Sequence, residues 1–141
     1  MKEKLFVILL LLFSCKRTVT YEENISNKLD DLDKFNFQKY SHVVIIPGSG
    51  CSGCISEAEA FFLENYENDK IFFIFTKINS LKILRLRIGD LLDRINVLID
   101  LNDIFFIKNS TSSLYPVILN IQNNKIITYK VLDPGENMEI N

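Results

Sequence analysis

The stretch that decides the fold is His42–Cys54, which has the sequence HVVIIPGSGCSGC. Its first part holds four consecutive β-branched residues, Val43–Ile46, which favour a buried strand. A glycine-rich turn follows, and Cys51 and Cys54 then stand where a helical pattern begins. The free amide groups and the positive dipole end of a helix stabilise a thiolate. The stretch therefore predicts a strand, a turn and a helix whose first residues hold a reversible dithiol.

Outward from this stretch, the spacing of apolar residues predicts alternating helices and strands. Helices are expected over residues 22–35, 51–66 and 80–94. Strands are expected over residues 42–46, 71–76, 97–99, 117–121 and 125–132. The last helix has Ser80 as its expected N-cap, and its apolar side is expected to include Leu84, Ile88 and Ile95.

Strands that alternate with helices form right-handed βαβ units with buried parallel strands, and the terminal hairpin adds an antiparallel edge. The chain is therefore expected to be an α/β protein with a mixed sheet. Its 141 residues, 48% of them hydrophobic and 24% charged, suit one globular domain. A formal net charge of −2, without a face of aromatic and basic residues, argues against a nucleic-acid partner.

The N-terminus has the sequence of an export signal. Lys2 and Lys4 precede an unbroken apolar run, Leu5–Phe13. A helix of this run is only about 14 Å long, which is roughly half the thickness of the hydrocarbon core of a bilayer. The run is therefore too short to span a membrane, and its length suits the core of a secretion signal.

Leu12-Phe13-Ser14-Cys15 resembles the lipobox of bacterial lipoproteins. The resemblance implies a signal peptide of residues 1–14, lipid on Cys15, a tether that ends at residue 23 and a folded domain over residues 24–141. The protein would then lie outside the cytoplasm, anchored to a bacterial membrane, with the periplasmic side expected. The alternative is an ordinary signal peptide, in which Cys15 has no special role. With Cys15 lipidated, the other two of the three cysteines remain to react with each other.

Over residues 40–132 the chain is similar to the thioredoxin fold, and within it to the TlpA-like, membrane-tethered thiol–disulfide oxidoreductases. Four features carry the resemblance: the CxxC of residues 51–54 after a strand, Glu57 beyond it, the strand and aspartate of Val97–Asp100, and Tyr115-Pro116 before the hairpin. The resemblance implies a three-layer, thioredoxin-like fold with a redox-active disulfide. It also implies that no cofactor is needed, because the dithiol itself carries the electrons.

Each matching residue would have a role in such a site. Cys51, on the more accessible side of the helix start, would attack as a thiolate, and Cys54 would resolve the mixed disulfide. Glu57 would handle the proton of the buried thiol. Pro116, which the family places in the cis form facing the cysteines, would leave the backbone of Tyr115 free to pair with an extended substrate. The partners would be exported proteins with disulfides or thiols, and an upstream thiol that donates or accepts electrons.

The chain departs from the family at Gly50, where tryptophan is usual, and at Gly53, where proline is common. Neither change removes a reacting atom, so the chemistry remains while the substrate and the direction of electron flow stay open. Only nine residues follow Leu132, which is too few for the closing helix of thioredoxin. We therefore expect the 22–35 helix to cover that face of the sheet.

Other interpretations of the two cysteines also stay open. They would form a structural disulfide if the chain were a non-catalytic binding module with the same fold. Zinc usually takes four ligands, and His42 is the only histidine that could join the pair. Copper delivery favours clustered methionines, and Met138 stands alone after the signal segment, so no metal is expected. Lys77 stands where thioredoxins often place a lysine near the dithiol, although we expect a surface side chain there.

Overall fold

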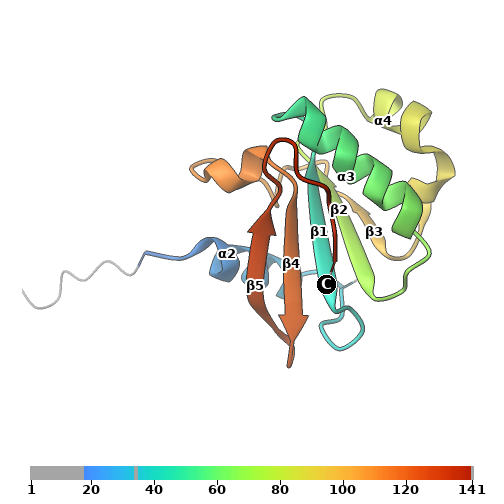
Figure 1. The fold of residues 1–141 in the computed structure, drawn as a ribbon. Helices are drawn as coiled ribbons and strands as arrows, with labels where there is room; N and C mark the ends of the chain where they lie inside the picture. The colour runs from blue at the N-terminus through green and yellow to red at the C-terminus, as the bar shows by residue number, and fades with distance from the viewer. Residues whose placement is uncertain (1–17, 34, 141) are drawn as a thin grey trace, which may run out of the picture.

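The computed structural model describes residues 18–33 and 35–140 (Figure 1). The predicted signal peptide and Cys15 lie outside these residues. The helices are α2 (Tyr21–Asp30), α3 (Ser52–Asn65) and α4 (Leu81–Ile88), with two short 3-10 helices, η1 (Gly89–Asp93) and η2 (Thr111–Leu114). The strands are β1 (His42–Pro47), β2 (Ile71–Thr76), β3 (Val97–Ile99), β4 (Val117–Gln122) and β5 (Lys125–Val131).

The strands of the described residues form one mixed sheet in the order β3-β2-β1-β4-β5. β1 pairs in parallel with β2, and β2 with β3, whereas β4 runs antiparallel to both β1 and β5. The predicted α/β class, with central parallel strands and an antiparallel hairpin, is confirmed, and the arrangement is compatible with a thioredoxin-like fold. Because β1 is the central strand, the turn and helix that follow it occupy the middle of the sheet's carboxyl edge.

The sheet is the middle of three layers. Successive side chains of a strand face opposite sides of the sheet. Val44 and Ile46 of β1 therefore join the core under α3 and α4, while Val43 and Ile45 join the core under α2. Figure 1 shows α3 and α4 on one side of the sheet and α2 on the other. Covered on both faces, β2 is buried along its whole length, which explains its unbroken apolar sequence.

The N-terminal helix begins earlier and ends earlier than expected. Thr20 forms a capping box with Glu23, in which the Thr20 hydroxyl accepts the Glu23 amide proton at 3.3 Å. The helix ends at Asp30, because the aspartates that follow are poor helix formers and their charge opposes the negative end of the helix dipole. Phe35 still packs against the sheet, stacked on the Tyr40 ring at 5.5 Å, although it lies beyond the helix.

The prediction of one continuous helix over residues 80–94 is wrong in its second half. Ser80 caps α4 as predicted, and its hydroxyl accepts the Ile83 amide proton at 3.3 Å. The helix then stops at Gly89, whose φ of +72° and ψ of −150° lie outside the helical region in a conformation that favours glycine. The chain continues as η1 and changes direction, so Ile95 is 74% exposed instead of lying on the apolar side.

The last described residues, 133–140, form a segment that we call the C-terminal strap. Met138 is 5% exposed and belongs to the same core cluster as Cys54, on the α3 side of the sheet. The 22–35 segment does cover a sheet face, but the face opposite α3, through Ile25 and Leu29 of α2. On the α3 side, the strap therefore adds Met138 to the cover that α3 and α4 give the sheet.

Candidate redox site

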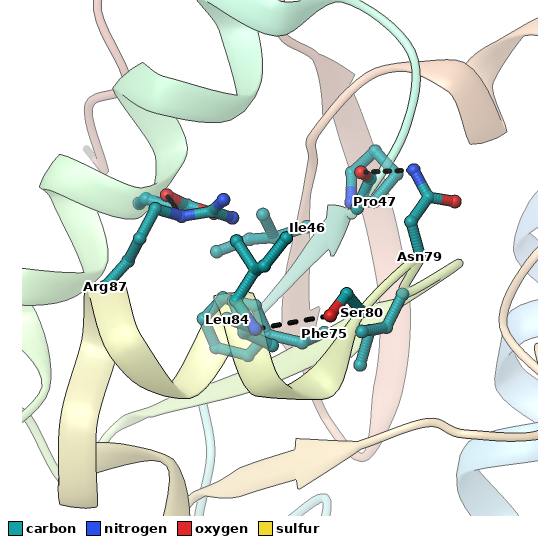
Figure 2. Close-up of a pocket in the computed structure, with 11 residues that line it drawn as sticks. Ile46, Pro47, Phe75, Asn79, Ser80, Leu84 and Arg87 are labelled. Carbon is teal, nitrogen blue, oxygen red and sulfur yellow. Dashed lines mark hydrogen bonds and ion pairs between the residues drawn. The ribbon is translucent and has the colours of Figure 1, made fainter.

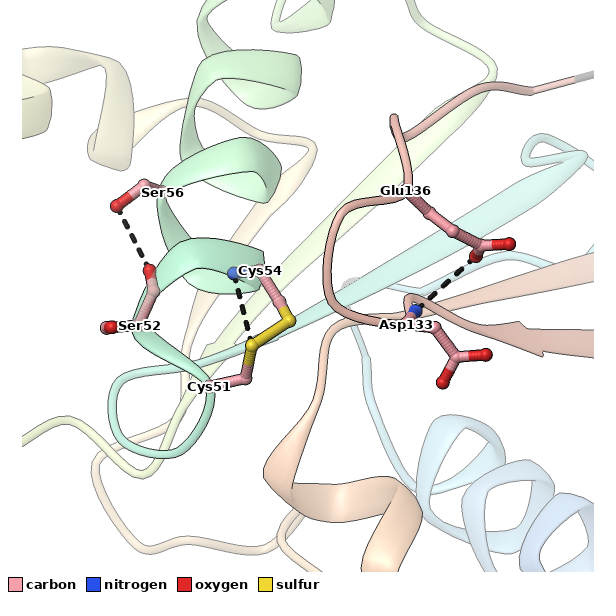
Figure 3. Close-up of a disulfide and its surroundings, with 6 residues drawn as sticks. All are labelled: Cys51, Ser52, Cys54, Ser56, Asp133 and Glu136. Atoms are coloured by element: carbon pink, nitrogen blue, oxygen red, sulfur yellow. Dashed lines mark hydrogen bonds between the residues drawn. A yellow bond between two sulfur atoms is a disulfide. The ribbon is translucent and has the colours of Figure 1, made fainter.

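Cys51 and Cys54 are joined by a disulfide at the start of α3 (Figure 3), with an S–S distance of 2.02 Å and a Cα–Cα distance of 5.3 Å. Cys51 is the N-cap residue of the helix, and its sulfur accepts the amide proton of Cys54 at 3.3 Å. The two cysteines are therefore within bonding reach at a helix N-terminus, as the sequence predicts. The same amide would stabilise a thiolate on Cys51 once the disulfide is reduced.

The two cysteine residues differ in their exposure to solvent. Cys54 is 3% exposed and packs in the core between α3 and the sheet, whereas Cys51 is partly exposed. Ser52 and Gly53, which separate them, are both exposed. An incoming thiol or disulfide can therefore reach Cys51 without moving the core, while Cys54 is protected.

The turn before Cys51 is held on both sides by backbone carbonyls. On one side, the Gly48 amide donates to the Thr76 carbonyl at 2.7 Å, and a Cβ at Gly48 would lie 2.7 Å from the Lys77 carbonyl oxygen. On the other side, the Cys51 amide donates to the Leu114 carbonyl at 3.3 Å. The turn is thus fixed between the end of β2 and the residues that precede β4.

Tyr115 and Pro116 lie beside this turn, but they differ from the expectation. None of the described peptide bonds is cis, so the bond before Pro116 is trans. Tyr115 leaves η2 in an extended conformation, with φ −123° and ψ 153°, and the chain continues directly into β4. The Tyr115 amide donates to the Ser112 carbonyl at 3.3 Å, so this amide is not free for a substrate strand.

Glu57 lies one helical turn beyond Cys54 and is partly exposed. Within residues 18–33 and 35–140, its carboxylate takes part in no hydrogen bond or ion pair. Lys77 behaves as the surface residue that we expected: its ammonium group pairs with Asp103 at 3.7 Å and lies 4.7 Å from the centre of the Phe106 ring.

The strap brings acidic residues into the surroundings of the disulfide, as Figure 3 shows for Asp133 and Glu136. The Asp133 amide donates to the Glu136 carboxylate at 3.4 Å, and Lys130 pairs with that carboxylate at 3.4 Å. Sequence reasoning missed these residues and Leu114. No local signal marks them, because their position beside the dithiol depends on how β4 and β5 pair.

A buried aspartate ties together the ends of the strands at this edge. Asp100 is 5% exposed and accepts three hydrogen bonds, from the Thr76 hydroxyl at 2.8 Å and the amides of Phe105 and Ile104 at 2.8 and 3.0 Å. The Thr76 bond ties Asp100 to the end of β2, and the two amide bonds hold the loop after β3 on Asp100. The aspartate of the Val97–Asp100 feature therefore has a structural role in this chain.

A cavity of about 180 Å³ lies between α3 and α4 (Figure 2). Its lining includes the apolar side chains of Ile46, Phe75 and Leu84. The Arg87 guanidinium and the Glu59 carboxylate, 2.6 Å apart, also line it. Neither cysteine lines the cavity, so it is separate from the dithiol.

Within the described part of the chain, no group of three or more His, Cys, Asp or Glu residues is placed to hold a metal ion. No helix among the same residues has both the length and the apolar character needed to cross a bilayer.

Comparison of the chain with protein-family models, with curated proteins and with solved structures gave no match.

Proposed function

We propose that this chain is a membrane-tethered thiol–disulfide oxidoreductase that exchanges disulfides with exported proteins through Cys51 and Cys54. One observation carries the proposal: the two bonded sulfurs at the start of α3 are unequal, with Cys51 partly exposed and Cys54 buried. Thiol–disulfide exchange passes through a mixed disulfide, and its rate depends on access to the attacking sulfur. One reachable and one protected sulfur suit such a two-step exchange.

In the reducing direction, the Cys51 thiolate attacks one sulfur of a substrate disulfide, and the other substrate sulfur leaves as a thiolate. The Cys54 thiolate then attacks the Cys51 sulfur of the mixed disulfide, which releases the second substrate thiolate. Two electrons pass from the dithiol to the substrate, and the Cys51–Cys54 disulfide is formed. In the oxidising direction the same steps run in reverse. An upstream thiol or disulfide restores the starting state.

Glu57 would accept the proton of the Cys54 thiol as that thiol becomes the attacking group. Its position one turn beyond Cys54, with a carboxylate engaged in no ion pair within the described residues, supports this role.

Lipid on Cys15 would hold the domain at a membrane surface outside the cytoplasm. Tyr115 would contribute its side chain, which packs against the core cluster of Cys54, to the surface that meets the substrate.

A second candidate is a non-catalytic binding module in which the disulfide is only structural. The occupied amide of Tyr115 favours it, because an extended substrate then lacks one of its expected backbone partners. The two candidates differ in the reduction potential of the disulfide.

The test is equilibration of the full chain with mixtures of reduced and oxidised glutathione, with the reduced fraction counted by thiol alkylation and mass spectrometry. A reduction potential between about −120 and −270 mV is that of a working exchanger and supports the proposal. A potential below about −300 mV is that of a structural disulfide and overturns it in favour of the binding module.

A further inference from the structure

Nine large apolar side chains of the described residues are exposed; Leu63 on α3 and Ile127 on β5 stand apart, and the other seven fall into two groups by the segments that carry them. The first, which we call the edge surface, consists of Val19, Leu101, Ile104 and Leu114, which are 44–64% exposed. The second, the helix-side surface, consists of Ile83, Leu86 and Ile95 on α4 and after η1, and these are 52–78% exposed. Both are candidates for contact with an apolar partner, since exposed apolar residues that cluster mark interaction sites.

The edge surface lies between the start of the domain and the dithiol. Val19 lines a surface hollow together with Ile107 and Thr111 of the loop that joins β3 to β4. The ammonium group of Lys28 on α2 donates to the Ile104 carbonyl in the same loop. At its far end this loop reaches Leu114, whose carbonyl accepts the Cys51 amide proton. The loop is therefore in contact with the exit of the N-terminal tether and with the dithiol turn.

The length of the tether decides which group can reach a membrane. If Cys15 carries the lipid, only residues 16–20 separate it from α2, and five residues span at most about 17 Å. A domain of this size has a radius of gyration of about 14 Å and is therefore roughly 35 Å across. The helix-side surface lies on the face of the sheet opposite α2, so a tether this short keeps it away from the bilayer.

We propose that the edge surface rests on the phospholipid bilayer, so that Cys51 meets its partners at the membrane surface. This deepens the proposed function and rests on it, because it needs the lipid on Cys15. The partner of the edge surface is the apolar and interfacial region of the lipid itself. The substrates of the dithiol are then polypeptide segments that lie close to a bilayer, such as those flanking a membrane anchor.

The chain contains no tryptophan, so one introduced tryptophan reports its own position. The test uses the full, lipidated chain in phosphatidylcholine vesicles whose acyl chains carry bromine, which quenches tryptophan emission on contact. Leu101→Trp and Ile104→Trp report on the edge surface. Leu86→Trp and Ile95→Trp are the matched controls, because those positions are at least as exposed but belong to the helix-side surface.

We expect loss of emission in brominated relative to plain vesicles for Leu101→Trp and Ile104→Trp, and unchanged emission for the two controls. Equal quenching at all four positions, quenching of the controls alone, or no quenching at the edge positions overturns the proposal. So does a mass spectrum without lipid on Cys15. Reduction of a small soluble disulfide by the same samples reports the dithiol separately, so loss of exchange with intact quenching contradicts only the redox function.

Discussion

The carbonyl oxygen of Leu114 occupies the place where a side chain of residue 50 would begin. A Cβ built on Gly50 would lie 2.0 Å from that oxygen, a distance that real Cβ atoms essentially never show. The same oxygen accepts the amide proton of Cys51 at 3.3 Å. The approach of the two backbones therefore excludes any side chain just before the dithiol, which accounts for the glycine at position 50.

Gly50→Ala should destabilise the protein, because the φ of Gly50 is +142° and its Cβ would meet the Leu114 backbone. We expect the free energy of unfolding, measured in urea, to fall by about 1–3 kcal/mol. Gly53→Ala is the control, since a Cβ there meets nothing within 4 Å. Equal effects of the two substitutions would show that the close approach to Leu114 does not exist in solution.

Cys54→Ser should trap covalent adducts, because Cys51 can still form a mixed disulfide that nothing resolves. Cys51→Ser should trap none, because Cys54 is only 3% exposed. Non-reducing gels and mass spectrometry of the two variants, isolated after contact with a disulfide-bonded protein, measure the adducts. Adducts at similar levels in both variants would contradict the roles assigned to the two sulfurs.

Met138→Ala should show that the strap is part of the core beside the dithiol. Met138 is 5% exposed in the cluster that contains Cys54, and removing a buried methionine side chain costs about 2–5 kcal/mol. Urea unfolding of the oxidised protein measures this loss. Glu139→Ala, at the exposed neighbouring position, is the control and should change stability little. Equal losses of stability in Met138→Ala and Glu139→Ala would show that the strap is detached in solution.

His42→Gln should flatten the pH dependence of stability near neutral pH. Burial lowers the pKa of His42, the only histidine, below its ordinary value of 6.5, so the unfolded chain takes up a proton more readily than the folded one. The free energy of unfolding should therefore be highest above pH 6.5 and should fall as the pH drops through the lower folded pKa. Urea unfolding of both proteins across this range gives the difference, and identical pH profiles would refute the assignment.

Elements with a strong periodic signal could be predicted from the sequence almost residue by residue. The strands 71–76 and 97–99 match the structure, and the expected terminal hairpin turns at Asn123 and Asn124, whose positive φ angles of 51° and 61° are those of a tight turn. The helix over residues 80–94 was wrong beyond Ile88, because apolar spacing continues through a glycine that ends the helix. The end of a helix depends on a single residue such as this glycine, and the average spacing of apolar residues does not detect it.

The sequence by itself determined that two cysteines follow a buried strand at the start of a helix, and hence that they can form a disulfide. Strand, turn and helix propensities are local, and they are enough to place both cysteines at the start of a helix. Only the tertiary structure decided which distant residues surround the pair and whether the Tyr115 amide is free. Those properties arise where β4, η2 and the strap meet the turn before Cys51, and contacts between segments more than 60 residues apart leave no mark in local sequence.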